Sequence, residues 1–67
     1  MTFTLNFAPE TWPAPGPTLA EIVAAHRWTA ALVAVTVNGL PVENARFDEV
    51  RPAEGDRIEA FFLVSGG

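Results

Sequence analysis

The chain has 67 residues, no Cys and one His, so it can form one small domain but neither a disulfide framework nor a multi-histidine zinc site. Hydrophobic residues make up 49% of the chain, which supplies enough apolar surface for a single core. The net charge of -4 repels phosphate and argues against a nucleic-acid partner.

The first residues, Met1 to Leu5, lack the cationic start and long apolar run of a secretory signal. No stretch approaches the apolar length that crosses a membrane. We therefore expect a cytoplasmic protein without a membrane partner.

Alternating polar and apolar residues predict a first strand over residues 2–7. Its apolar side chains would share one buried face: Phe3, Leu5 and Phe7. Four prolines and a glycine between residues 9 and 17 disfavour regular pairing, although residues 10–12 could form a brief edge strand.

A helix is predicted to begin at Thr18, because Thr18 and Glu21 have the spacing of a capping box. Apolar residues then follow at helical spacing: Leu19, Ile22 and Val23. We expect the helix to end near Arg27 or Trp28, with His26 in its last turn.

Residues 32–38 alternate again and predict a second long strand, with its valines on one face: Val33, Val35 and Val37. Asn38-Gly39 is the preferred pair for a type I′ turn. The chain would therefore return as a short edge segment, residues 40–42, that contains Pro41.

The connection over residues 43–57 is mostly polar, and Phe47 and Val50 are its candidates for the core. A turn at residues 54–56 precedes the last apolar run, a predicted strand over residues 58–64. The side chains expected inward are Ile58, Ala60, Phe62 and Val64. The side chains expected outward are Phe61 and Leu63, and an inverted register would bury these two instead.

This order of elements predicts an α+β fold in which one main helix packs across a mixed sheet of four to five strands. We expect a single domain over residues 1–64 and a flexible tail over residues 65–67.

Catalytic constellations are missing from the sequence, which has one His, one Ser and no Cys, Lys or Tyr. His26 could act as a general base, but a helix-end imidazole on a partly buried face is the simpler interpretation. The acidic pairs, Asp48-Glu49 and Glu54/Asp56, fall in a turn-rich segment and are typical of solvated loop charges. We expect no catalytic residue and no metal ligand in this chain.

The sequence ends in Ser65-Gly66-Gly67, directly after the last apolar run. Glycine lacks a Cβ, so such a tail can thread a narrow cleft that other residues could not enter. A terminal carboxylate is ionised and unreactive near neutral pH, so another protein must activate it first. A merely frayed terminus is the alternative.

These motifs in this order resemble the ThiS/MoaD family of ubiquitin-like sulfur carriers. The resemblance covers nearly the whole chain and is carried by Phe3-Thr4-Leu5-Asn6, Thr18-Leu19-Ala20-Glu21-Ile22, Val33-Ala34-Val35-Thr36-Val37-Asn38-Gly39, Glu54-Gly55-Asp56-Arg57-Ile58-Glu59 and Gly66-Gly67. The resemblance implies a β-grasp fold and a carrier protein rather than an enzyme.

The resemblance also implies a chemistry and a set of partners. A ThiF-like adenylyltransferase would use ATP and magnesium to form an acyl-adenylate on Gly67, while the chain itself would bind no cofactor. Sulfur from a cysteine-desulfurase relay would then convert the adenylate to a thiocarboxylate. A ThiG-like thiazole synthase would accept that sulfur during thiamine biosynthesis.

Several alternatives remain open at this point. The ending Val64-Ser65-Gly66-Gly67 looks equally like that of the molybdopterin synthase small subunit, a MoaD-like carrier. A protein-conjugating modifier would use the same activated tail. A non-covalent ubiquitin-like module would instead work through Phe61 and Leu63, which are also the candidate docking residues of a carrier.

Overall fold

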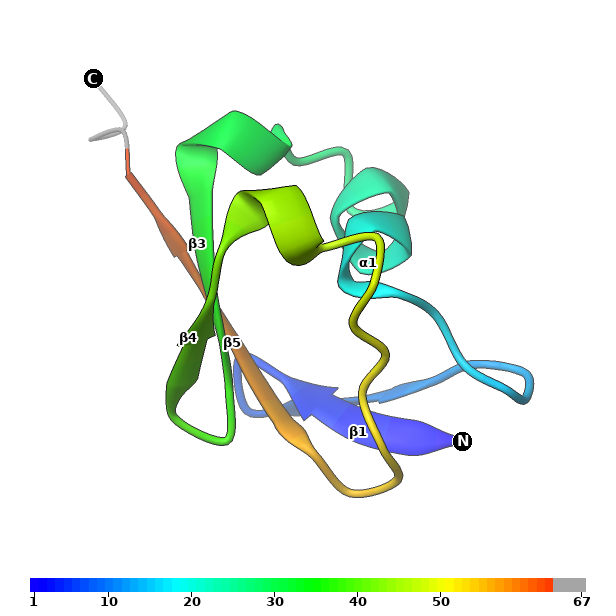
Figure 1. Ribbon diagram of the computed structural model, residues 1–67. Coiled ribbons are helices and arrows are strands. Elements are labelled where there is room, and N and C mark those ends of the chain that lie inside the picture. The colour runs from blue at the N-terminus through cyan, green and yellow to red at the C-terminus, as the bar shows by residue number, and fades with distance from the viewer. Residues whose placement is uncertain (64–67) are drawn as a thin grey trace.

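The computed structural model describes residues 1–63, so Val64 and the predicted tail lie outside the described residues. Its elements are β1 (Thr2–Leu5), β2 (Ala8–Thr11), α1 (Leu19–Ala25), β3 (Val33–Val37), β4 (Leu40–Val42) and β5 (Arg57–Phe62), with short 3-10 turns η1 (Ala30–Leu32) and η2 (Asn44–Arg46). The helix α1 packs across one face of the sheet (Figure 1).

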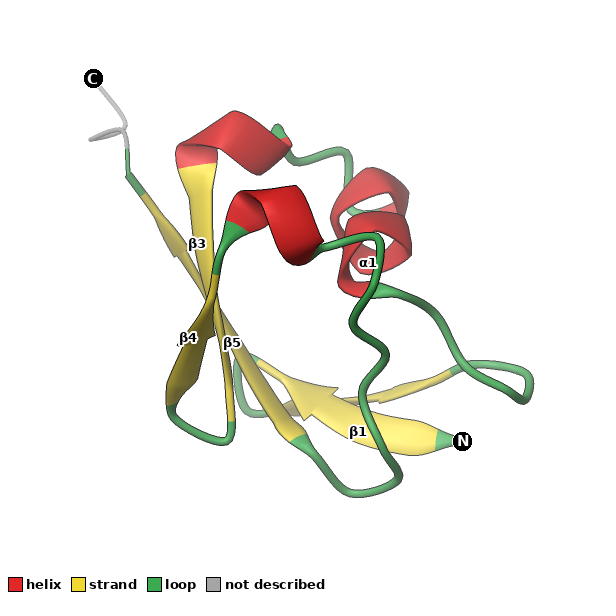
Figure 2. Cartoon of the chain, in the orientation of Figure 1, coloured by secondary structure: helices red, strands yellow, loops and turns green. Residues whose placement is uncertain are grey.

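The five strands form one sheet in the order β2-β1-β5-β3-β4. The two central strands, β1 and β5, run parallel, and every other neighbouring pair is antiparallel. Figure 2 shows the sheet as one layer and α1 as the layer beside it. The predicted α+β class is confirmed, and so are the mixed sheet and the single main helix of the β-grasp fold.

The core lies between α1 and the sheet. Its buried apolar side chains come from both layers and from the connection after β4: Phe3, Leu5, Leu19, Ile22, Val23, Val33, Val35, Phe47, Ile58 and Ala60. Phe47 is 2% exposed, and Val50 packs against the core from the same connection, as the sequence predicts. Burial of large apolar side chains holds the domain together, since each fully buried side chain of this size contributes roughly 1.5–3 kcal/mol to the free energy of unfolding.

The helix begins with the predicted capping box. The backbone N–H of Glu21 donates to Thr18 Oγ1 at 3.1 Å, and the N–H of Thr18 donates to Glu21 Oε1 at 2.7 Å. These reciprocal bonds satisfy donors that the first helical turn leaves free.

The helix ends slightly earlier than predicted, in a Schellman motif. The N–H of Arg27 donates to the carbonyl of Ala24 at 3.0 Å, and the N–H of Trp28 donates to the carbonyl of Val23 at 3.0 Å. This closure requires a left-handed residue, and Arg27 has a φ of 60°. The motif turns the chain sharply and brings Trp28 back against the core.

Residue Phe7 does not lie where the sequence pattern predicts. Leu5 pairs with Ala8, so Asn6 and Phe7 alone make the turn from β1 to β2. Both have left-handed backbones, with φ of 50° and 70°, as a two-residue turn between twisted strands requires. Phe7 is 76% exposed, and the prediction that it lies on the buried face is wrong because the residue is part of the turn itself.

The two edge strands each contain a proline, Pro9 in β2 and Pro41 in β4. The turn before β4 is the predicted Asn38-Gly39 pair, with φ of 52° and 84°. The edge strand predicted over residues 10–12 is present as β2, two residues earlier at its start. Proline lacks a backbone N–H, so both outer edges are poor templates for pairing with another chain.

We predict that Arg27→Gly stabilises the domain, because glycine adopts the left-handed backbone without the steric cost that a Cβ imposes. The expected gain is about 1 kcal/mol in the free energy of unfolding, measured by urea denaturation. Arg27→Ala is the control, since it removes the charge but keeps the Cβ. An equal gain in both variants would contradict the backbone explanation.

Candidate functional site

The C-terminal end of β5 is the point from which the chain continues toward residues 64–67. On one side, β3 follows β5 to its end, with Val33 opposite Phe62. The N–H of Leu63 then donates to the carbonyl of Leu32 at 2.9 Å and continues this ladder by one bond. Antiparallel pairing therefore holds β5 to the last described residue.

On the other side of β5, the ladder with β1 is shorter. Strand pairing ends at Leu5 and Ile58, where the N–H of Asn6 donates to the carbonyl of Ile58 at 2.9 Å. The Asn6 side chain adds one more bond, because its Oδ1 accepts the N–H of Ala60 at 2.8 Å. Among residues 1–63, β5 thus has strand neighbours on both sides at its start and only β3 at its end.

Asn6 is a residue whose role at this site the sequence reasoning missed. Its alternation with the neighbouring residues suggested an outward strand position, whereas the residue starts the turn and reaches across to Ala60. The available signal was its residue type, since Asn tolerates a left-handed backbone better than other side chains do.

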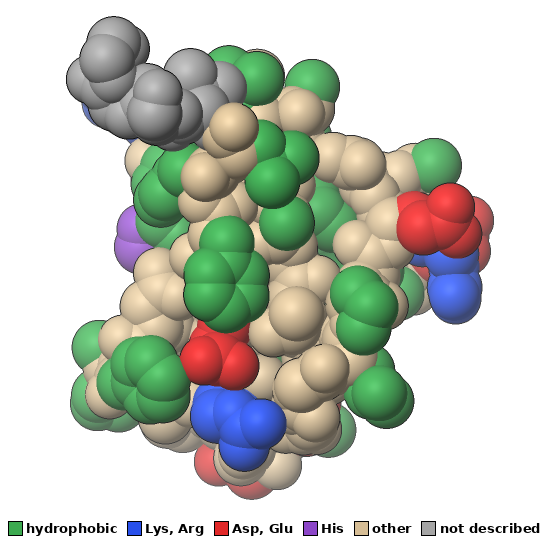
Figure 3. All heavy atoms as spheres, turned by 90° about the vertical axis from the view of Figure 1, so that its left-hand side faces the viewer, with side chains coloured by type: hydrophobic (Ala, Val, Ile, Leu, Met, Phe, Trp, Pro, Cys, Tyr) green, Lys and Arg blue, Asp and Glu red, His purple; other side chains and the backbone are tan. Residues whose placement is uncertain are grey.

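The outer face of the sheet carries the two candidate docking side chains. Phe61 is 51% exposed and Leu63 is 65% exposed, so the register that leaves both at the surface is the one in the structure. Phe61 lies opposite Ala34 of β3, whose small side chain leaves the ring open to solvent. Figure 3 views this face, with hydrophobic side chains over its middle part and an acidic and a basic side chain beneath them.

Phe62 lies on the inner face, as predicted, yet its side chain is 54% exposed. The helix ends at Ala25 and does not cover the end of β5. The contact comes instead from Trp28, whose ring meets that of Phe62 edge to face at 5.2 Å between centroids and 84° between planes. Apolar rings are therefore exposed on both faces at the end of β5.

His26 lies at the end of α1, where its Nε2 is 2.9 Å from Glu10 Oε1. Its ring stacks on that of Trp28, with the centroids 4.7 Å apart and the planes at 23°. The side chain is 36% exposed, which fits the interpretation of a helix-end imidazole on a partly buried face, and its partners are a carboxylate and an aromatic side chain.

The acidic pairs are only partly the solvated charges that the sequence suggested. Glu54 accepts the N–H of Thr2 at 2.9 Å, and Asp56 accepts Asn38 Nδ2 at 3.0 Å and the N–H of Ala53 at 2.7 Å. These carboxylates tie turns together at the start of β5.

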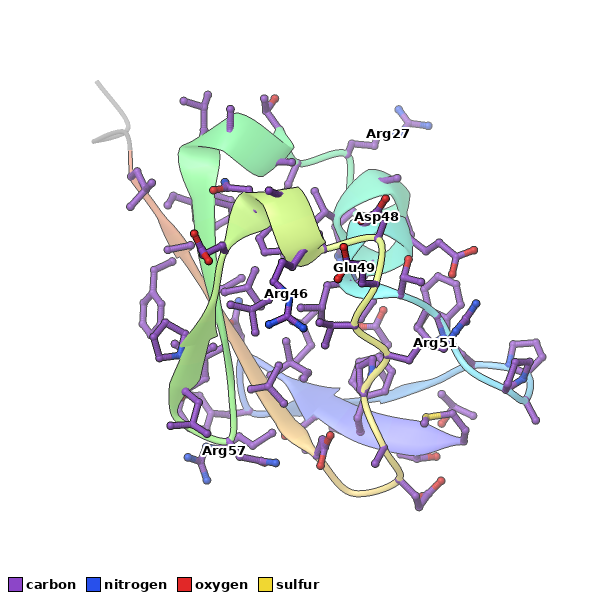
Figure 4. The ribbon with its side chains drawn as sticks, in the orientation of Figure 1. Arg27, Arg46, Asp48, Glu49, Arg51 and Arg57 are labelled. Atoms are coloured by element: carbon purple, nitrogen blue, oxygen red, sulfur yellow. The ribbon has the colours of Figure 1, made fainter. Side chains whose placement is uncertain are left out.

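Asp48 and Glu49 fit the predicted solvated charges better. They lie on the connection beside α1, away from the C-terminal end of β5 (Figure 4). Glu49 is mostly exposed and meets Arg46 at 3.5 Å. Within the described part of the chain, no three potential metal ligands among His, Cys, Asp and Glu lie together.

We predict that Asn6→Ala loosens the middle of β5, because the N–H of Ala60 loses its acceptor. The expected loss is about 1–2 kcal/mol in the free energy of unfolding, with faster hydrogen exchange at the Ala60 amide. Asn6→Asp is the matched control, since it keeps an acceptor oxygen at the same place. Unchanged exchange at Ala60 in the alanine variant would contradict this role.

No protein-family model matches the chain, and no curated protein matches it either.

No helix in residues 1–63 has the length and apolar character needed to cross a membrane.

Solved structures provide the informative comparison. The crystal structure of the thiamine biosynthesis protein ThiS from Geobacter metallireducens is 29% identical, with a TM-score of 0.80 and 100% of both chains covered. A solution NMR structure of a thiamine biosynthesis protein from the same organism is 30% identical, with a TM-score of 0.78, and covers 100% of this chain and 88% of that one. With this identity over its whole length and the same mixed five-stranded sheet around one helix, the chain belongs to the ThiS family of thiamine biosynthesis proteins.

Proposed function

We propose that this protein is the sulfur carrier for thiazole formation in thiamine biosynthesis and acts as a co-substrate rather than an enzyme. The observation that carries the proposal is the full-length likeness to ThiS together with a Gly66-Gly67 ending that follows β5. The thiamine neighbours favour this pathway over the molybdopterin pathway, which the ending alone left equally open.

In this proposal the working group is the carboxylate of Gly67. An ionised carboxylate is a poor acyl donor, so a ThiF-like adenylyltransferase first joins it to AMP, with ATP and magnesium held by that enzyme. The terminal sulfur of a persulfide carried by a cysteine-desulfurase relay then attacks the acyl carbon and displaces AMP, which gives an acyl disulfide. A thiol reductant cleaves its S–S bond, so that the thiocarboxylate is released and the thiol and the relay cysteine are left as a disulfide. A ThiG-like thiazole synthase takes up the sulfur and returns the carboxylate.

The tail residues suit this role because of their size. Gly66 and Gly67 have no Cβ, so the backbone can pass through an opening too narrow for other residues. Ser65 adds only a short polar side chain between the glycines and β5. Each partner can therefore reach the same carboxylate in its own active site. In this proposal the carrier and its partners work together in the cytoplasm.

Phe61 and Leu63 are the proposed docking residues for these partners. Both are apolar, more than half exposed and close to the point where the chain leaves β5. A partner that covers these side chains would bury apolar surface and set the tail at its active site in one step.

We predict that the protein gains the mass difference between sulfur and oxygen when it is incubated with its adenylyltransferase, ATP, magnesium and a sulfur source. Intact-protein mass spectrometry measures this change and also reports the C-terminus of the starting material. Deletion of Gly66-Gly67 should lower activation at least about 100-fold, because the reacting group then stops short of the active site. The thermal midpoint of this variant should match that of the intact protein.

A variant with extra residues after Gly67 serves as the control for the free terminus. It keeps both glycines and the whole domain but blocks the carboxylate. Sulfur incorporation into this untrimmed variant would overturn the proposal. Sulfur transfer to a molybdopterin precursor, and not to a thiazole precursor, would instead assign the carrier to the MoaD-like alternative.

We predict that Phe61→Asp weakens binding to the adenylyltransferase about 10- to 100-fold, as loss of an apolar anchor at an interface does. Leu40→Asp is the matched control, since Leu40 is 71% exposed and lies at the opposite end of the sheet, opposite Val37. Titration calorimetry measures both affinities. Equal losses in the two variants would exclude a specific docking role for Phe61.

A further inference from the structure

The end of β5 lacks a strand neighbour on the β1 side within residues 1–63, yet on its inner face one of its rings has a packed partner. Phe62 meets Trp28, which is the residue that the Schellman motif returns to the core after α1. Edge-to-face aromatic pairs stabilise a defined ring orientation beyond the burial of their area. Trp28 thus supports the inner face of β5 beyond the point where pairing with β1 ends.

Trp28 is itself held by a second set of contacts. Its indole stacks on His26 at 4.7 Å, and His26 Nε2 lies 2.9 Å and 3.2 Å from the two Glu10 oxygens. Trp12 Nε1 also donates to Glu10 Oε1 at 3.3 Å. A continuous set of contacts therefore runs from the edge strand β2 past the end of α1 to Phe62.

The aromatic contacts are the stronger part of this set. The His26 and Glu10 side chains are 36% and 21% exposed, so solvent weakens their attraction. Trp28 is partly buried and packs on the core, which limits its own motion. Removing Trp28 should therefore matter more for Phe62 than removing the charged pair.

We propose that Trp28 is a positioning residue for the carrier tail: by holding the Phe62 ring it fixes the direction in which the chain leaves β5. The inference rests on the proposed function, since this direction matters because the tail must enter a partner's active site. A tail that samples more directions presents its terminus correctly for a smaller fraction of the time. The apparent affinity falls by that fraction, while the chemistry after binding is unchanged.

The test compares Trp28→Leu with the intact protein by NMR relaxation and by the kinetics of adenylation. We expect the backbone order parameters of Phe62 and Leu63 to fall from about 0.85 toward about 0.6, while those of β3 stay high. We expect the KM for the carrier to rise about 3- to 10-fold with kcat unchanged. Trp28→Phe keeps an aromatic ring at this place and should restore most of both values.

Two further variants separate positioning from general stability. Phe62→Leu removes the other ring of the pair, and because Phe62 is half exposed its loss leaves the core intact; it should reproduce the effect of Trp28→Leu. Val50→Ala removes partly buried surface on the connection after β4 and should lower stability without raising KM.

The NMR measurement does not depend on any partner, so the two proposals fail separately. Unchanged order at Phe62 and Leu63 in Trp28→Leu, or a KM that rises equally in Val50→Ala, would overturn the positioning role. An intact protein that is never adenylated would refute the proposed function, whereas a loss of order at Phe62 would still support the contact through Trp28.

Discussion

The parallel pairing of β1 with β5 is the contact on which the rest of this structure depends. It joins the first strand of the chain to the last, with Thr4 donating to the carbonyl of Asp56 at 3.0 Å and Asn6 donating to that of Ile58 at 2.9 Å. Closing so long a loop costs chain entropy, which burial of side chains from both strands offsets. The β1–β2 and β3–β4 hairpins then extend the sheet outward from this centre, and α1 covers the face that results.

The same pairing explains why the end of β5 differs from its beginning. Asn6 turns β1 away after two paired positions, while β3 continues beside β5 to Leu63. The end of the strand therefore runs past β1 but stays paired with β3, with Phe61 on one face and Phe62 on the other. In the proposed function, a strand end that β3 still holds is a suitable base for a tail that enters a partner.

The distribution of exposed apolar groups fits this arrangement. Prolines in β2 and β4 make the outer edges poor sites for strand addition, whereas Phe61, Phe62 and Leu63 gather at the end of the central strand. Strand addition is thus disfavoured along the edges, and the exposed apolar side chains at the end of β5 are the surface that the proposed docking would use. Trp28 adds packing on the inner face of this region without closing it to solvent.

The sequence by itself determined the features that depend on near neighbours. The capping box at Thr18, the Asn38-Gly39 turn and the alternation in β3 each follow from interactions within a few residues, so the class of fold was predictable. The exposure of Phe7 and Phe62 was not: Phe7 falls in the turn after β1, and Phe62 lies on the predicted face but is 54% exposed. Alternation predicts which face of a strand a residue lies on. It does not predict where β1 ends and turns, or how far α1 extends over the sheet.

Only the tertiary structure decided what surrounds the end of β5. The bond from Asn6 to Ala60 and the ring contact between Trp28 and Phe62 join residues 54 and 34 positions apart, and no local spacing encodes either. Both depend on where β1 and α1 stop relative to a strand formed much later in the chain. A side chain is buried only where another segment of the chain packs over it. Burial at the end of β5 therefore depends on segments that are distant in the sequence.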